Sequence, residues 1–66
     1  MEIIVNGEAR QVADSCTVAN LIEELDLTGK RLAVEVNLDI VPRSSHPEHR
    51  LQAGDKVEIV HAIGGG

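Results

Sequence analysis

The residues best suited to chemistry stand at the end of the chain, which reads Ala62, Ile63, Gly64, Gly65 and Gly66. At an average glycine frequency of about 7%, three glycines in a row arise by chance on the order of a few times in ten thousand. Glycine has no Cβ atom, so a glycine-rich end can stay extended, thread a narrow channel and reach a buried catalytic centre. The pattern predicts a flexible tail that offers its terminal carboxylate to a partner enzyme, although chain ends are also commonly frayed.

Three apolar residues stand beside this tail, where the alternation of the last predicted strand breaks down: Val60, Ala62 and Ile63. At least one of these side chains is expected to face outward. Isolated exposed apolar groups are ordinary on protein surfaces. A tail that must be led into an enzyme nevertheless favours a contact role, so we predict a partner interface at these three residues.

Cys16 is the only cysteine and lies next to Thr17, at the predicted start of a helix. The helix dipole would favour a reactive thiolate at such a position. Free cysteine is more often a small buried hydrophobe, and we assign Cys16 no chemical role. A single cysteine also leaves no partner for a disulfide within the chain.

His46 and His49 are three residues apart with Glu48 between them, a spacing that would bring two imidazoles together on a helix. Pro47 interrupts this segment, and no third ligand accompanies the pair. We therefore predict solvated loop histidines and no metal site.

The composition narrows the classes of function. With 66 residues the chain has room for one domain, and with no Phe, Trp or Tyr it lacks the aromatic rings that stack on nucleic-acid bases. The formal net charge of −5 repels nucleic acid and anionic membranes and favours a basic protein partner. No leader or long apolar run is evident, so a cytoplasmic protein is expected.

The hydrophobic pattern predicts the elements that must position the tail. Residues 1–5 and 8–12 are expected to form a hairpin around Asn6-Gly7, which suits a type I′ turn. Thr17 is the expected N-cap of a helix, and Gly29 a plausible stop beyond its end. The apolar stripe of this helix has a period of about 3.6 residues and comprises Val18, Leu21, Ile22 and Leu25.

Further strands are predicted over residues 32–36, 40–41 and 56–61, with turns at 37–39 and 53–55. Residues 43–50 are expected to form an irregular connection or a single helical turn. Because one amphipathic helix is the only cover available for these strands, we expect an α+β fold in which that helix lies across one face of a small mixed sheet.

Several segments carry a resemblance to a known family: Val5-Asn6-Gly7-Glu8, Val36-Asn37, Ile40-Val41-Pro42-Arg43, Gly54-Asp55-Lys56-Val57-Glu58-Ile59 and the glycine end. In this order they resemble the ubiquitin-like β-grasp family, and within it the sulfur carriers of thiamine biosynthesis. The resemblance covers essentially the whole chain. It implies a β-grasp domain over residues 1–63 and a flexible glycine tail over residues 64–66.

The resemblance also implies a chemistry. An adenylating enzyme would use ATP to activate the Gly66 carboxylate, a sulfur-donor protein would supply the sulfur of a thiocarboxylate, and a thiazole synthase would accept it. Gly64 and Gly65 would be presented to the active sites of these partners. The chain has no Gly-x-x-x-x-Gly-Lys phosphate loop, so we expect a co-substrate that binds no cofactor itself and is not an enzyme.

Three alternatives stay open. The first is a sulfur carrier for another pathway, such as the molybdenum cofactor, an amino acid or a siderophore. The second is a ubiquitin-like modifier joined to a lysine of a target protein. The third is a non-covalent binding module with an incidental tail.

Overall fold

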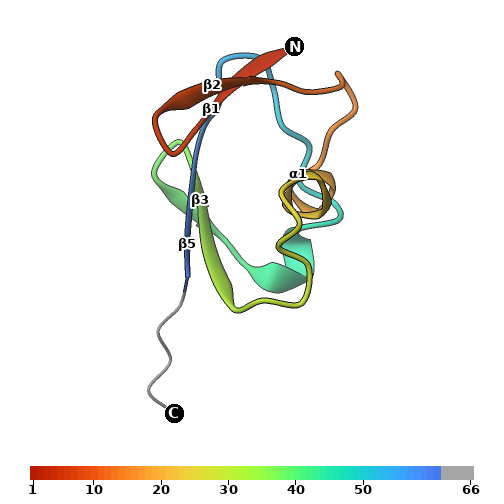
Figure 1. Cartoon of the computed structure of the whole chain (residues 1–66), viewed down its shortest axis with the longest axis vertical. Helices are drawn as coiled ribbons and strands as arrows, with labels where there is room; N and C mark the ends of the chain where they lie inside the picture. Colours follow the sequence, from red (N-terminus) through yellow and green to blue (C-terminus); the bar gives the residue numbers. More distant parts are fainter. Residues whose placement is uncertain (62–66) are drawn as a thin grey trace.

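The computed structural model describes residues 1–61 (Figure 1). Five strands, one α-helix and one 3-10 turn follow one another along the chain. They are β1 (Glu2–Val5), β2 (Glu8–Gln11), α1 (Val18–Glu24), β3 (Leu32–Val36), β4 (Asp39–Val41), η1 (Arg43–Ser45) and β5 (Lys56–His61). The predicted elements are therefore all present, and the bounds of the strands agree with the predicted ones to within one or two residues.

The five strands form one sheet in the order β2-β1-β5-β3-β4. β1 and β5 run parallel, whereas the other neighbouring strands are antiparallel, so the sheet is mixed. Figure 1 shows α1 lying across one face of this sheet. The predicted α+β arrangement, with one helix over a small mixed sheet, is confirmed. No helix within residues 1–61 is long and apolar enough to cross a membrane.

The backbone N–H groups at the start of α1 are hydrogen-bonded both by nearby side chains and by a segment far away in the sequence. Thr17 is the N-cap, as predicted, and its side chain and that of Asn20 form a reciprocal capping box. The backbone N–H groups of Val18 and Ala19 donate to the carbonyls of residues 49 and 46 across the fold, each at 3.0 Å. The segment after η1 therefore caps donors that a helix cannot satisfy by itself.

The prediction of solvated histidines in this segment needs a correction. His46 is only 8% exposed, and its Nε2 lies 3.2 Å from the carbonyl oxygen of Val41, while His49 is half-buried. The expectation of a solvated loop histidine is wrong for His46, whose backbone approaches the helix start to accept a hydrogen bond, whereas His49 keeps part of its surface in water.

The helix ends earlier than Gly29 predicted. Asp26 adopts a left-handed conformation with φ 59°, and the N–H of Leu27 donates to the carbonyl of Ile22 at 3.0 Å. This bond belongs to a Schellman motif, in which Asp26 is the left-handed residue. Aspartate tolerates the left-handed conformation better than most residues. Gly29 also has a positive φ, of 85°, but lies in the loop that follows.

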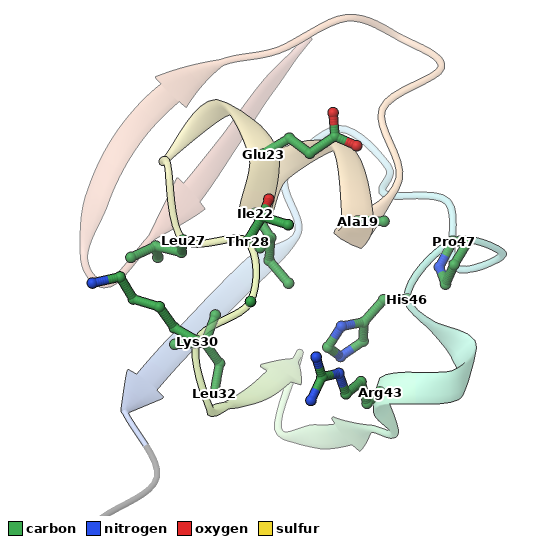
Figure 2. A pocket seen from close by; sticks show the side chains of 11 residues that line it. Ala19, Ile22, Glu23, Leu27, Thr28, Lys30, Leu32, Arg43, His46 and Pro47 are labelled. Carbon is green, nitrogen blue, oxygen red and sulfur yellow. The ribbon is translucent and has the colours of Figure 1, made fainter.

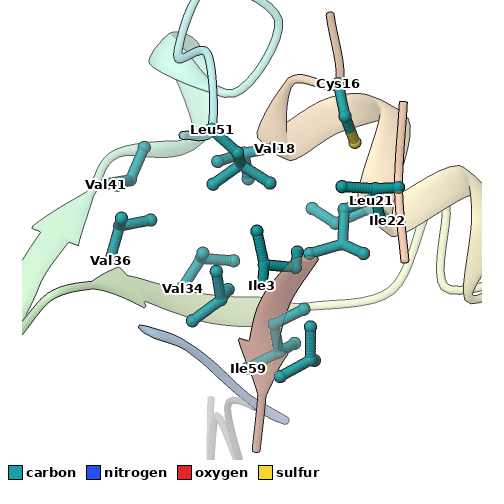
Figure 3. Packing of buried hydrophobic residues seen from close by; sticks show 13 residues of the cluster. Ile3, Cys16, Val18, Leu21, Ile22, Val34, Val36, Val41, Leu51 and Ile59 are labelled. Atoms are coloured by element: carbon teal, nitrogen blue, oxygen red, sulfur yellow. The ribbon is translucent and has the colours of Figure 1, made fainter. Parts of the chain in front are cut away.

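The core lies between α1 and the sheet and contains only aliphatic side chains and one thiol (Figure 3). Its largest fully buried side chains are Ile3, Leu21, Leu51, Val18, Val34 and Val57. Leu21 is 0% exposed, whereas Leu25, at the end of the predicted stripe, is only partly buried. The helix therefore attaches to the sheet mainly through Val18, Leu21 and Ile22.

We predict that Leu21→Ala lowers the free energy of unfolding by about 2–5 kcal/mol, because it leaves a cavity in a fully buried site. Leu25→Ala should have a clearly smaller effect, since part of its side chain is already in water. Urea unfolding followed by far-UV circular dichroism suits a chain without aromatic residues. Equal losses for the two variants would contradict this description of the core.

Candidate functional site

β5 is the strand that leads to the glycine tail, and it is the central strand of the sheet. It pairs with β3 along all of its length except the first residue, from Val57 opposite Val36 to His61 opposite Leu32. Its parallel pairing with β1 is much shorter and ends at Val57. The second half of β5 would therefore have only one backbone neighbour.

A side chain completes this pairing. The Asn6 amide Nδ2 donates to the carbonyl of Ile59 at 3.2 Å, and its Oδ1 accepts from the N–H of Ile59 at 2.8 Å. Asn6 thus imitates a further residue of β1 alongside β5. Sequence reasoning gave Asn6 a turn role only, which the φ values of 50° at Asn6 and 84° at Gly7 confirm. The pairing with β5 was missed, because nothing local indicates a contact 53 residues away.

Val60 is 57% exposed and lies opposite Ala33 on the sheet face turned away from α1. This agrees with the prediction that an apolar side chain faces outward just before the tail. The interface role of Val60 stays a prediction. Ala62 and Ile63, and the predicted tail of Gly64, Gly65 and Gly66, lie outside the described residues.

The same sheet face carries features that sequence reasoning missed. Leu38 and Ile40 are 84% and 74% exposed, and Glu35 lies directly opposite Glu58 across β3 and β5. The alternation of strand residues could have placed Glu35, Ile40 and Glu58 outward, whereas Leu38 lies in the turn between β3 and β4. Their proximity depends on the register between strands, which the sequence does not state.

A hollow of about 200 Å³ lies between the end of α1 and η1 (Figure 2). Its apolar lining includes Ile22, Leu27 and Leu32, and its rim carries Lys30 and Arg43. Within residues 1–61, no group of three or more metal-ligating side chains is present.

Cys16 is 3% exposed, which confirms its interpretation as a small buried residue. Burial raises the pKa of its thiol, and the carboxylate of Glu24 raises it further, while Arg10 acts in the opposite direction. The thiol is therefore neutral at physiological pH, a state unsuited to nucleophilic chemistry.

The sequence and the fold are similar to those of known proteins. A family model described as the ThiS family matches residues 3–66. The sulfur carrier protein ThiS of Escherichia coli (strain K12) is 38% identical over 66 residues, which cover all of both chains. A crystal structure of the thiamine biosynthesis protein ThiS from Geobacter metallireducens superposes with a TM-score of 0.86 at 30% identity, also over the full length of both chains.

The chain also matches part of a larger protein. It is 47% identical over 66 residues to a thiazole synthase of Paramagnetospirillum magneticum, and it spans 20% of that relative's length. The structural likeness to ThiS confirms the ubiquitin-like β-grasp fold expected from the sequence.

We predict that Asn6→Gly lowers the free energy of unfolding by about 1–3 kcal/mol, because it removes both hydrogen bonds to Ile59. Glycine accepts the positive φ of the turn, so this variant separates the two roles of Asn6. Hydrogen exchange of the Ile59 amide should accelerate more than that of β5 amides paired with β3. Unchanged protection of the Ile59 amide would show that Asn6 does not hold the strand.

We predict that stability declines as pH rises above about 9, partly through Cys16. The folded state holds the thiol proton to higher pH than the unfolded chain, so deprotonation favours unfolding in this range. Cys16→Ala removes this contribution, and its unfolding free energy should fall less steeply with pH. Parallel pH profiles for the two proteins would contradict a raised thiol pKa.

Proposed function

This chain belongs to the ThiS family, and we propose that it is a sulfur carrier of thiamine biosynthesis. The observation that carries the proposal is the full-length match to a sulfur carrier, together with the Gly64-Gly65-Gly66 segment that follows the central strand. The domain presents a reacting group, and the reaction itself is carried out by partner enzymes.

The reacting group is the Gly66 carboxylate. A carboxylate is stabilised by resonance and is a poor acyl donor until one oxygen becomes part of a good leaving group. Attack of this carboxylate on the α-phosphate of ATP forms a glycyl adenylate and releases pyrophosphate. A sulfur donor then attacks the activated carbonyl, and AMP departs with the original oxygen. A donor that delivers sulfur at the oxidation level of sulfide gives the thiocarboxylate directly, whereas a persulfide on a donor protein gives an acyl disulfide, which a thiol must reduce to release the thiocarboxylate. The new sulfur is more nucleophilic than the oxygen it replaces.

The division of labour follows from what the domain contains. The chain has no phosphate-binding loop, and the only thiol is buried and neutral at physiological pH. An adenylating enzyme is therefore proposed to bind ATP, and a separate sulfur-donor protein to supply sulfur. Because the activation consumes ATP, we place it in the cytoplasm.

A thiazole synthase is the proposed acceptor of the sulfur. Thiazole synthases of Paramagnetospirillum magneticum and Magnetococcus marinus match this chain over one fifth of their length, at 47% and 36% identity. Joining two modules in one chain raises their effective concentration toward each other. The fusion supports a partnership between this domain and a thiazole synthase.

We predict that incubation with ATP, an adenylating enzyme and a sulfur donor replaces one oxygen by sulfur at Gly66. Intact mass spectrometry should show the corresponding mass increase, and fragmentation should place it on the last residue. A variant lacking Gly65 and Gly66 is the matched control and should stay unchanged. An unaltered mass of the full chain with its authentic partner would overturn the proposal.

The same samples separate the alternatives. A protein modifier would give slower-migrating conjugates on a denaturing gel, which the truncated variant would abolish. A non-covalent binding module would keep its function after truncation. Formation of the thiocarboxylate without rescue of a thiamine auxotroph that lacks its own carrier would assign the protein to another sulfur pathway.

A further inference from the structure

The hollow between the end of α1 and η1 is a surface feature that the reaction at Gly66 does not explain (Figure 2). Its volume is about 200 Å³, and its apolar wall is formed by Ile22, Leu27 and Leu32. Sites for free small ligands usually measure roughly 300–1,000 Å³ and enclose most of the ligand. The hollow is therefore better matched to one or two side chains of another protein than to a whole metabolite.

Two cations line the same hollow. Lys30 and Arg43 are exposed, and Figure 2 shows them on opposite sides of it. The ion pairs within residues 1–61 engage the N-terminal ammonium group and Arg10, so neither cation has a carboxylate partner in this part of the chain. Glu23 also lines the hollow, but its carboxylate points away from both cations in Figure 2. An anionic group at the mouth of the hollow would thus meet two available cations.

The charge of these two residues is opposite to that of the chain as a whole. The formal net charge is −5, so most of the surface repels an acidic segment of another protein. Arg31, the neighbour of Lys30 in the sequence, is exposed as well and adds to the positive charge of this region. Charge therefore directs an acidic segment to the hollow and away from the rest of the domain.

The wall that carries Arg43 is held in place by hydrogen bonds. His46 lines the hollow on the same side, and its Nε2 lies 3.2 Å from the carbonyl oxygen of Val41. The carbonyl of His46 accepts from the N–H of Ala19 at 3.0 Å, which connects the segment after η1 to α1. The hollow is therefore a preformed part of the folded domain.

The hollow also lies near the point at which the chain leaves the sheet. Leu32, in its wall, pairs with His61, the last residue of β5. Five residues follow His61, and five residues span at most about 17 Å. A protein docked in the hollow is therefore within reach of the reacting end of the chain.

The proposed reaction needs two proteins at this domain at the same time, because the sulfur donor attacks a glycyl adenylate that the adenylating enzyme holds. Val60, a predicted partner contact, lies on the sheet face turned away from α1, whereas the hollow lies on the side of α1. We propose that the hollow docks the sulfur-donor protein, through a segment in which an aliphatic side chain stands beside a carboxylate. This assignment rests on the proposed function.

The two parts of this segment have separate contacts. The aliphatic side chain fills the space between Ile22, Leu27 and Leu32, where its contacts exclude water from the charged groups beside it. The carboxylate accepts hydrogen bonds from Arg43 and Lys30, and such bonds between ionised groups are stronger than neutral ones. The apolar contact supplies binding, and the charges select an acidic partner.

The test separates sulfur transfer from adenylation. For the double variant Lys30→Gln and Arg43→Gln, the donor concentration that gives half the maximal rate of thiocarboxylate formation should rise about tenfold, measured by intact mass spectrometry. Ala19→Leu adds apolar bulk inside the hollow and should cause a similar rise. Pyrophosphate exchange into ATP, which needs only the adenylating enzyme and the carrier, should change much less in both.

Arg50→Gln is the matched control, because it removes a positive charge from an exposed position that does not line the hollow. It should leave the half-maximal donor concentration unchanged within about twofold. Raising the salt concentration from about 20 mM to about 200 mM should raise this concentration more for the unsubstituted protein than for the double variant. Thermal unfolding followed by circular dichroism verifies that each variant is folded.

A second measurement tests the chemistry of the hollow without any enzyme. 4-Methylpentanoate carries a leucine-like side chain and a carboxylate, and 4-methylpentanamide is its neutral counterpart. In ¹H–¹⁵N correlation spectra of the labelled domain, the carboxylate should shift the amide resonances of Ile22, Leu27 and Leu32 at lower concentration than the amide does. The double variant should lose this preference.

An unchanged half-maximal donor concentration in both the double variant and Ala19→Leu overturns the proposal, as does an equal response of the hollow to the two small molecules. A loss confined to pyrophosphate exchange would overturn the choice of the sulfur donor as occupant. If the unsubstituted chain is not adenylated at all, the proposed function fails, and the sulfur donor fails with it. The small-molecule titrations would still show whether the hollow prefers an anion.

Discussion

The pairing of β5 at the centre of the sheet is the constraint on which the rest of the structure depends. β5 carries the chain from the core to the glycine segment, so any freedom in this strand would move the reacting end relative to the domain. β3 pairs with it from Val57 to His61, and Asn6 extends the shorter contact with β1 as far as Ile59. These contacts therefore fix the end of β5 relative to the rest of the sheet.

The domain is small and has a limited hydrophobic core with which to hold β5 in place. A chain of 66 residues without aromatic side chains buries little surface per residue, so unsatisfied backbone groups would be costly. The helix has seven residues, and its first N–H groups are bonded by Thr17 and by the carbonyls of His46 and His49. The irregular segment after β4 thus completes the hydrogen bonding at the start of the helix.

Local chemistry made much of the fold predictable. The Asn6-Gly7 turn, the Thr17 cap and the apolar stripe each depend on residues close together in sequence, and the structure confirms them. The burial of His46 depends on a contact across the fold, and the opposition of Glu35 and Glu58 depends on strand register. Neither leaves a local pattern. The predicted interface stays a prediction, since the structure shows only that Val60 is exposed, and Ala62 and Ile63 lie beyond the described residues.

The central claim is that the Gly66 carboxylate carries sulfur while the folded domain provides recognition. Top-down mass spectrometry of the protein isolated from its native cell, grown under thiamine limitation, tests this claim most directly. The account predicts a population in which one oxygen of the last residue, Gly66, is replaced by sulfur. Protein that contains only an ordinary carboxylate, or in which Gly66 is joined to a further residue by a peptide bond, would contradict it.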